Sequence, residues 1–148
     1  MGGMDGPATV YDPRYLAGVL LFNRGDFFEA HEAWEALWMD TAGPDRTFYQ
    51  GLIQAAVGLC HFCNGNVRGA VKLYHSGRAY IEPLGSPYWG LDTARFWEEM
   101  GRCFAEVLPG PKEPDRALRP RDELIPVITL APAPESWPDP ADFADSEE

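Results

Sequence analysis

The pattern of apolar and polar residues along residues 12–108 indicates helices throughout. Residues with known helix-starting and helix-ending preferences set the limits. Asp12-Pro13, Asp26 and Asp92 are start signals, and Pro109 ends the last helix. The predicted helices cover residues 13–22, 27–39, 45–62, 67–81 and 93–107. The predicted fold class is therefore all-α, a small helical bundle of about five helices.

A short pattern occurs twice, at an offset of 40 residues. The first copy is Phe22, Gly25, Asp26 and Ala30, and the second is Phe62, Gly65, Asn66 and Ala70. In both copies a helix ends, a glycine turns the chain, a short polar residue caps the next helix, and an alanine permits close packing. This pattern predicts two stacked helical hairpins. The offset does not match the period of tetratricopeptide repeats, and two units are too few for a solenoid.

Polar residues also fall on the apolar sides of the second and third helices. On a helical wheel, His31 lies beside Phe27 and Trp38, and Glu35 lies next to it. In the third helix Gln50, Gln54 and His61 share one narrow stripe, with Gly51 and Gly58 at its edge. A buried polar group without a partner costs about 1–3 kcal/mol. The two stripes are therefore predicted to face each other and form a polar cluster.

Three interpretations of this cluster are open: a structural hydrogen-bond network, a ligand pocket, and a metal site. The candidate ligand-binding residues are Glu29, His31, Glu32, Glu35, Gln50, Gln54 and His61. A divalent metal would use the His31 and Glu35 pair, with a third ligand from elsewhere, such as His61 or His75. Residues 31–35 resemble the H-E-x-x-H zinc motif, but glutamate replaces its second histidine.

Charge and cysteine content limit the possible partners and location. The chain has 148 residues, of which 23 are acidic and 12 basic, for a net charge of −11. This charge disfavours binding to nucleic acids or to anionic membranes. The three cysteines suit a reducing compartment, and no secretory signal is evident, so a cytoplasmic location is expected. The charge-free stretch between Arg46 and Arg68 is interrupted by glutamines and predicts a buried helix rather than a membrane span.

Composition divides the chain into three parts. Residues 1–11 are predicted to be a flexible N-terminus, residues 12–108 the helical bundle domain, and residues 109–148 a proline-rich acidic tail. The tail holds nine of the fourteen prolines and −6 of the net charge, so it is expected to be partly extended or disordered. Within it, residues 124–130 are apolar enough to lie as a strap against the folded body.

Two motifs carry a resemblance to a known family. The first is Asn23-x-Gly25-x-Phe27-Phe28-Glu29-Ala30-His31-Glu32-x-x-Glu35-x-x-Trp38, and the second is Gln50-Gly51-Leu52-Ile53-Gln54-x-Ala56. With them, residues 12–108 resemble domain-of-unknown-function family 309. The resemblance implies a small all-helical cytoplasmic protein and implies no activity. Its pattern singles out Glu29, His31, Glu32, Glu35, Gln50 and Gln54.

These observations favour a cytoplasmic binding module whose polar pocket, between the second and third helices, holds a small molecule or a protein segment. One alternative is a metal-assisted or acid/base hydrolase, with His31 as ligand or base and Glu32 or Glu35 as ligand or proton carrier. Another is an interaction or scaffold protein without a small-molecule site. The aromatic residues suit a core, with Phe27, Phe28, Trp34 and Trp38 as members, and the acidic, aromatic-rich bundle suits a homodimer.

Overall fold

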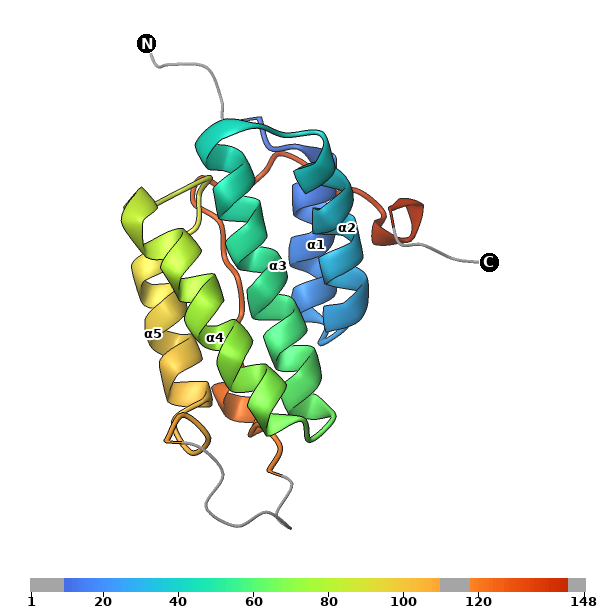
Figure 1. Cartoon of the computed structure of the whole chain (residues 1–148). Coiled ribbons are helices and arrows are strands. Elements are labelled where there is room, and N and C mark those ends of the chain that lie inside the picture. The colour runs from blue at the N-terminus through green and yellow to red at the C-terminus, as the bar shows by residue number, and fades with distance from the viewer. Residues whose placement is uncertain (1–9, 110–117, 144–148) are drawn as a thin grey trace.

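The computed structural model describes residues 10–109 and 118–143, and within them it contains α-helices and short 3-10 turns but no strand (Figure 1). The α-helices are α1 (Pro13–Asn23), α2 (Phe27–Met39), α3 (Gly43–Cys63), α4 (Val67–Ile81) and α5 (Thr93–Cys103). The predicted all-α fold is confirmed. Expectations that concern residues 1–9, 110–117 and 144–148 lie outside the described residues.

The two predicted hairpin turns have the same geometry. Gly25 and Gly65 both have positive φ, at 84° and 79°, a conformation that glycine adopts without steric cost. In the first turn the Asp26 N–H donates to the Leu21 carbonyl at 2.9 Å, and in the second the Asn66 N–H donates to the His61 carbonyl at 2.8 Å. The repeated sequence pattern therefore corresponds to a repeated structure.

Capping groups fix the starts of several helices. Asp12 accepts a hydrogen bond from the Arg14 N–H at 2.9 Å, and Asp92 accepts one from the Arg95 N–H at 3.0 Å, as the sequence predicts. Asp26 makes no such side-chain bond, although α2 begins directly after it, at Phe27. The third helix starts earlier than predicted, at Gly43, and the fifth ends earlier, at Cys103.

The core lies between the helices and is rich in aromatic rings. Trp34 is fully buried, and its indole N–H donates to the Tyr15 carbonyl at 3.1 Å. A Cβ atom at Gly18 would overlap this indole, so α1 and α2 approach closely only because residue 18 is glycine. Phe28 is 54% exposed, which corrects its assignment to the core, and Trp38 is half-buried beneath the guanidinium of Arg46.

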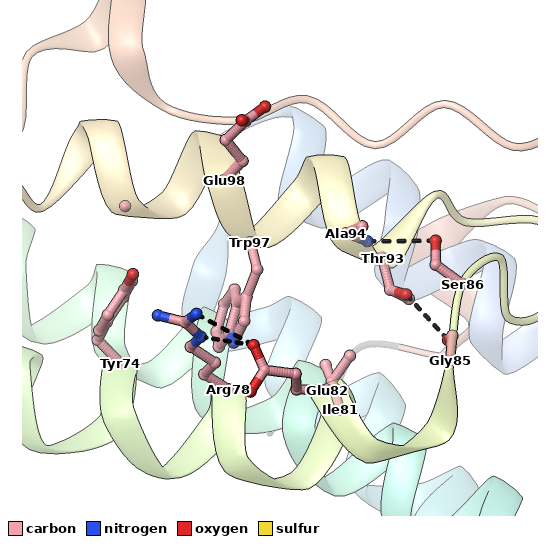
Figure 2. A pocket seen from close by; sticks show the side chains of 11 residues that line it. Tyr74, Arg78, Ile81, Glu82, Gly85, Ser86, Thr93, Ala94, Trp97 and Glu98 are labelled. Atoms are coloured by element: carbon pink, nitrogen blue, oxygen red, sulfur yellow. Dashed lines mark hydrogen bonds and ion pairs between the residues drawn. The ribbon is translucent and has the colours of Figure 1, made fainter.

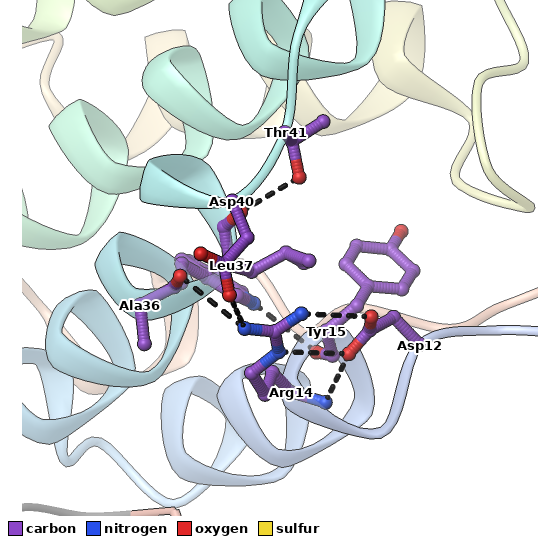
Figure 3. A network of polar contacts seen from close by, with 8 residues as sticks. Asp12, Arg14, Tyr15, Ala36, Leu37, Asp40 and Thr41 are labelled. Atoms are coloured by element: carbon purple, nitrogen blue, oxygen red, sulfur yellow. Dashed lines mark hydrogen bonds and ion pairs between the residues drawn. The ribbon is translucent and has the colours of Figure 1, made fainter.

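A polar network also joins α1 to α2 at one end of their hairpin (Figure 3). The guanidinium of Arg14 bonds to the carboxylate of Asp12 at 3.2 Å and to that of Asp40 at 2.7 Å. It also donates to the carbonyl of Ala36 at 3.4 Å. Arg14 thus ties the start of α1 to the end of α2.

Residues 118–143 pack against the body as an extended segment that passes from α5 to α1 (Figure 1). The side chain of Asn23 bonds to both backbone groups of Ile128, donating at 2.9 Å and accepting at 2.8 Å. Ile128 and Leu130 are buried in the core, and the Ala131 N–H donates to the Gly90 carbonyl. Tyr11 is also buried and donates to the Pro132 carbonyl at 2.6 Å, although the sequence assigned it to the flexible N-terminus.

Among the described residues, none of the helices has the length and hydropathy that crossing a membrane requires.

Candidate functional site

The polar stripe predicted on α2 lies at the surface. His31 is half-buried; its Nδ1 lies 2.7 Å from the Phe28 carbonyl oxygen and its ring packs on the Phe28 ring. Glu35 is exposed, whereas Glu29 and Glu32 are half-buried. The helical wheel placed His31 nearer the core than the structure does, because the core side of α2 is filled by larger apolar residues such as Trp34.

The stripe predicted on α3 bonds towards α4. Gln54 accepts a hydrogen bond from the hydroxyl of Ser76, on α4. His61 lies beside Asn66, the residue before α4, with 3.4 Å between the His61 Nδ1 and the Asn66 Nδ2. Gln50 is half-buried. For Gln54 and His61 the partner is therefore on the α4 side, and the pocket between α2 and α3 stays a prediction.

Glycines bring α3 and α4 together along the same face. A Cβ atom on Gly51 would lie 3.1 Å from the Gly77 carbonyl oxygen, and one on Gly77 would lie 3.1 Å from the Gly51 carbonyl oxygen. The sequence places Gly51 at the edge of the α3 stripe, and the structure identifies α4 as the helix that approaches it there. No group of three or more His, Cys, Asp or Glu side chains that could hold a metal ion occurs within residues 10–109 and 118–143.

A groove between α4 and α5 is the candidate site (Figure 2). Its volume is about 490 Å³, a size that suits a small molecule or a short peptide segment. We call it the α4–α5 groove. The residues that line it are Tyr74, Arg78, Ile81, Glu82, Gly85, Ser86, Thr93, Ala94, Trp97, Glu98 and Gly101.

Trp97 supplies the distinctive chemical group of the groove. Its side chain extends from α5 towards α4 and is 6% exposed (Figure 2). The indole Nε1 is shielded from solvent and has no hydrogen-bond partner among the described residues. Buried polar atoms in folded proteins are nearly always paired, so an unpaired indole N–H in the wall of a groove is an unused donor.

Aromatic rings fix the position of that donor. The Trp97 ring stacks on Phe96, with 5.6 Å between centroids, and on Tyr74, with 5.4 Å between centroids. On the other side, Gly77 leaves room for the ring, because a Cβ atom there would lie 3.1 Å from it. Stacking on two rings, with the Gly77 backbone close by, leaves the indole little freedom to turn its N–H towards another acceptor.

Two ion pairs involve the charged residues of the groove: Arg78 pairs with Glu82 inside it, and Glu98 pairs with Arg102, outside it, at 3.7 Å. Arg78 bonds to Glu82 through its Nε and its Nη2, at 3.1 Å and 3.0 Å. Because Glu82 accepts these bonds, the pKa of Arg78 is raised above its ordinary value. Figure 2 shows the pair in front of the Trp97 indole, with Glu98 further away on α5.

The two hydroxyl side chains at the loop end of the groove, Ser86 and Thr93, are already engaged. The Ser86 hydroxyl donates to Asp92 at 3.1 Å and accepts from the Ala94 N–H at 3.2 Å. The Thr93 hydroxyl donates to the Gly85 carbonyl at 3.2 Å. These bonds hold the loop before α5 in place. The exposed Arg78–Glu82 pair is therefore the group that an occupant meets first, and the shielded Trp97 N–H lies behind it (Figure 2).

Sequence reasoning missed this groove. The wheel analysis looked for polar residues on apolar faces, whereas the groove is marked by an aromatic residue on an ordinary amphipathic helix. The spacing of Arg78 and Glu82 is that of a common surface ion pair. The sequence does not indicate that the Trp97 N–H lacks an acceptor, because the pairing of this group depends on how α4 and α5 pack.

The fold places this chain among small all-helical bundles built from antiparallel hairpins. Residues 15–73 match the model of a family described as "Domain of unknown function (DUF309)", which confirms the resemblance for that segment. The matched segment contains both hairpin motifs and ends just before Tyr74, the first residue of the α4–α5 groove. No curated protein matches the sequence.

Proposed function

We propose that this protein is a helical binding module and that its ligand occupies the α4–α5 groove. The observation that carries the proposal is the buried, unpaired N–H of Trp97 in the wall of a groove of about 490 Å³. An unsatisfied buried donor costs about 1–3 kcal/mol, and a ligand that offers an acceptor recovers that cost.

The groove favours an amphipathic ligand. Tyr74, Ile81 and Trp97 present ring and aliphatic surface, while Arg78 and the Trp97 N–H can bond to a polar head group. This combination of apolar lining and a few directed polar groups is typical of small-molecule sites. The scaffold that holds it is rigid, because stacked rings and the bonded loop fix the groove from both sides.

NMR spectra of isotope-labelled protein test the proposal, because each tryptophan gives its own indole N–H signal. The probes are phenylacetate and phenylacetamide, which share an aromatic body and differ in carrying a carboxylate or a neutral amide. At least one probe is expected to shift the Trp97 signal in a saturable way. The Trp34 signal is expected to stay in place, because that N–H is bonded to the Tyr15 carbonyl.

A pair of matched variants shows whether the groove itself is the site. Ala94 and Ala79 are both exposed helical residues, and Ala94 lines the groove whereas Ala79 does not. Ala94→Tyr is expected to abolish the Trp97 shift, and Ala79→Tyr is expected to preserve it. The proposal fails if neither probe moves the Trp97 signal, or if Ala94→Tyr leaves the shift unchanged.

A further inference from the structure

We infer that the ligand of the α4–α5 groove is a small monocarboxylate with an apolar or aromatic body, and that its carboxylate takes the place of Glu82 on Arg78. This inference rests on the proposed function and adds the chemical class of the ligand. The ion pair, the unpaired donor and the charge of the protein support it.

Another carboxylate can readily replace that of Glu82 on the Arg78 guanidinium. The side chains of the Arg78–Glu82 pair are 51% and 64% exposed, so solvent screens their attraction and the pair adds little to folding stability. A guanidinium offers its N–H groups in a planar fork that matches a carboxylate. In the structure only Oε2 of Glu82 is bonded, at 3.0–3.1 Å, so the pair leaves the second carboxylate oxygen without an arginine bond.

A ligand carboxylate has an advantage over Glu82 because it can use two donors. The Arg78–Glu82 pair lies in front of the Trp97 indole, so displacing Glu82 from Arg78 opens the way to the shielded N–H (Figure 2). One ligand oxygen can then bond to Arg78 while the other accepts from the Trp97 N–H, which has no partner among the described residues. Glu82 is attached to the end of α4 and does not make the second bond in this structure. Arg78 and Trp97 both line the groove, so a head group that replaces Glu82 lies beside both side chains.

Charge restricts the ligand to a single negative group. The chain carries a net charge of −11, and Glu82 and Glu98 both line the groove. This field repels multiply charged anions such as nucleoside polyphosphates more strongly than a single carboxylate, which Arg78 can bind in place of Glu82. The remaining surface, from Tyr74, Ile81 and Trp97, suits an apolar or aromatic body.

Binding of either probe tests whether the groove is a site, and the ratio of the two affinities tests whether the site prefers a carboxylate. Wild-type protein is expected to bind phenylacetate about tenfold more tightly than phenylacetamide, which is the size of one charge-assisted hydrogen bond. The affinity is read from the Trp97 indole shift. Glu82→Gln is expected to strengthen phenylacetate binding several-fold, because the competing carboxylate is gone, and to leave phenylacetamide unchanged. Arg78→Gln is expected to remove the preference for the carboxylate.

The chain offers a matched control pair on the neighbouring helix. Arg95 and Glu99 form the same Arg-to-Glu pair, four residues apart, at 3.3 Å, but neither lines the α4–α5 groove. Arg95→Gln and Glu99→Gln are therefore expected to leave both affinities unchanged. The Trp34 signal reports that each variant is folded.

Equal affinities for the two probes in wild-type protein, or a Glu82→Gln variant with an unchanged ratio, would overturn the carboxylate assignment while leaving the groove as a binding site. If neither probe moves the Trp97 signal in any variant, the proposed function fails as well. The two failures are therefore distinguishable in one experiment.

Discussion

Two tryptophans occupy opposite situations in this fold. Trp34, on α2, is fully buried and donates its N–H to the Tyr15 carbonyl. Trp97, on α5, is almost as buried, yet its N–H has no acceptor among the described residues and lies in the wall of a groove. Burial alone therefore does not separate a closed core from an open site. What differs between the two tryptophans is whether the indole N–H has a hydrogen-bond acceptor.

The difference follows from how the two helix pairs are connected. The helices α1 and α2 form a tight hairpin around Gly25, and Gly18 lets the Trp34 indole reach α1. In contrast, residues 82–92 separate α4 from α5 and contain two prolines and two glycines. The two helices meet at the stacked rings of Tyr74 and Trp97, and beside those rings the groove stays open.

Removal of the Trp34 side chain tests the closed region and has the largest expected effect. Trp34→Ala leaves a cavity in the core and is expected to lower the free energy of unfolding by about 3–5 kcal/mol. Urea denaturation followed by far-ultraviolet circular dichroism measures the change. Trp137, which is 44% exposed, supplies the control, and Trp137→Ala is expected to cost less than about 1 kcal/mol.

Conservative replacement compares the two tryptophans directly. Trp34→Phe loses a satisfied hydrogen bond, whereas Trp97→Phe removes a donor that is already unpaired. The first change is expected to cost about 1–2 kcal/mol more than the second. The same urea titrations apply. Equal costs would mean that the Trp97 N–H finds an acceptor in the unliganded protein, and the contrast between the two regions would disappear.

The free energy of unfolding is expected to depend on alkaline pH through Cys103, a buried residue of α5. Burial raises the pKa of its thiol to about 12, above the ordinary value of 9.0. The resulting stabilisation is fully present below pH 9 and is lost as the pH rises through 12. Between about pH 7.5 and 9.5 the free energy of unfolding is expected to fall by about 0.8 kcal/mol from this group.

The Cys103→Ala variant should lack that part of the pH dependence. Burial also raises the pKa of Tyr15, in the closed region, well above its ordinary value of 10.0, so its contribution is lost only at higher pH. Burial also raises the pKa of Cys63, on α3, so the difference between wild type and the Cys103→Ala variant, rather than the slope itself, measures the α5 contribution. An identical slope in wild type and variant would contradict the assignment of this effect to Cys103.

The smallest expected effects are on the outer face of α2. His31→Gln and Glu35→Gln are each expected to change the free energy of unfolding by less than about 0.5 kcal/mol, because Glu35 is exposed and His31 is only half-buried. Thermal or urea denaturation of the two variants is sufficient. A loss above about 1 kcal/mol would instead indicate that these residues belong to a buried polar cluster.

Much of the fold was predictable from local signals. The glycine and polar residue at each hairpin turn, and the aspartates before α1 and α5, act on their own few neighbours, so their effect can be deduced without the rest of the chain. The start of α3 was harder to predict. Its first residue is Gly43, at positive φ just before Pro44, in a stretch whose composition resembles a loop.

The candidate site was much less predictable. The wheels placed Gln54 and His61 on one side of α3, but a wheel does not say which neighbouring helix faces that side. The structure brings α4 to that face, where Ser76 meets Gln54 and Gly51 meets Gly77. Phe28 failed as a core residue for the same reason, because its place on the wheel was known but the extent of the core was not.

The sequence by itself determined an acidic, all-helical chain of stacked hairpins, because helix starts, helix ends and turns depend on neighbouring residues. Only the tertiary structure decided which polar groups are paired. Trp34 and Trp97 are the same residue type on amphipathic helices, and whether an indole N–H meets an acceptor depends on the backbone that packs opposite it. That long-range packing closes the core at α1 and α2 and leaves the groove open between α4 and α5.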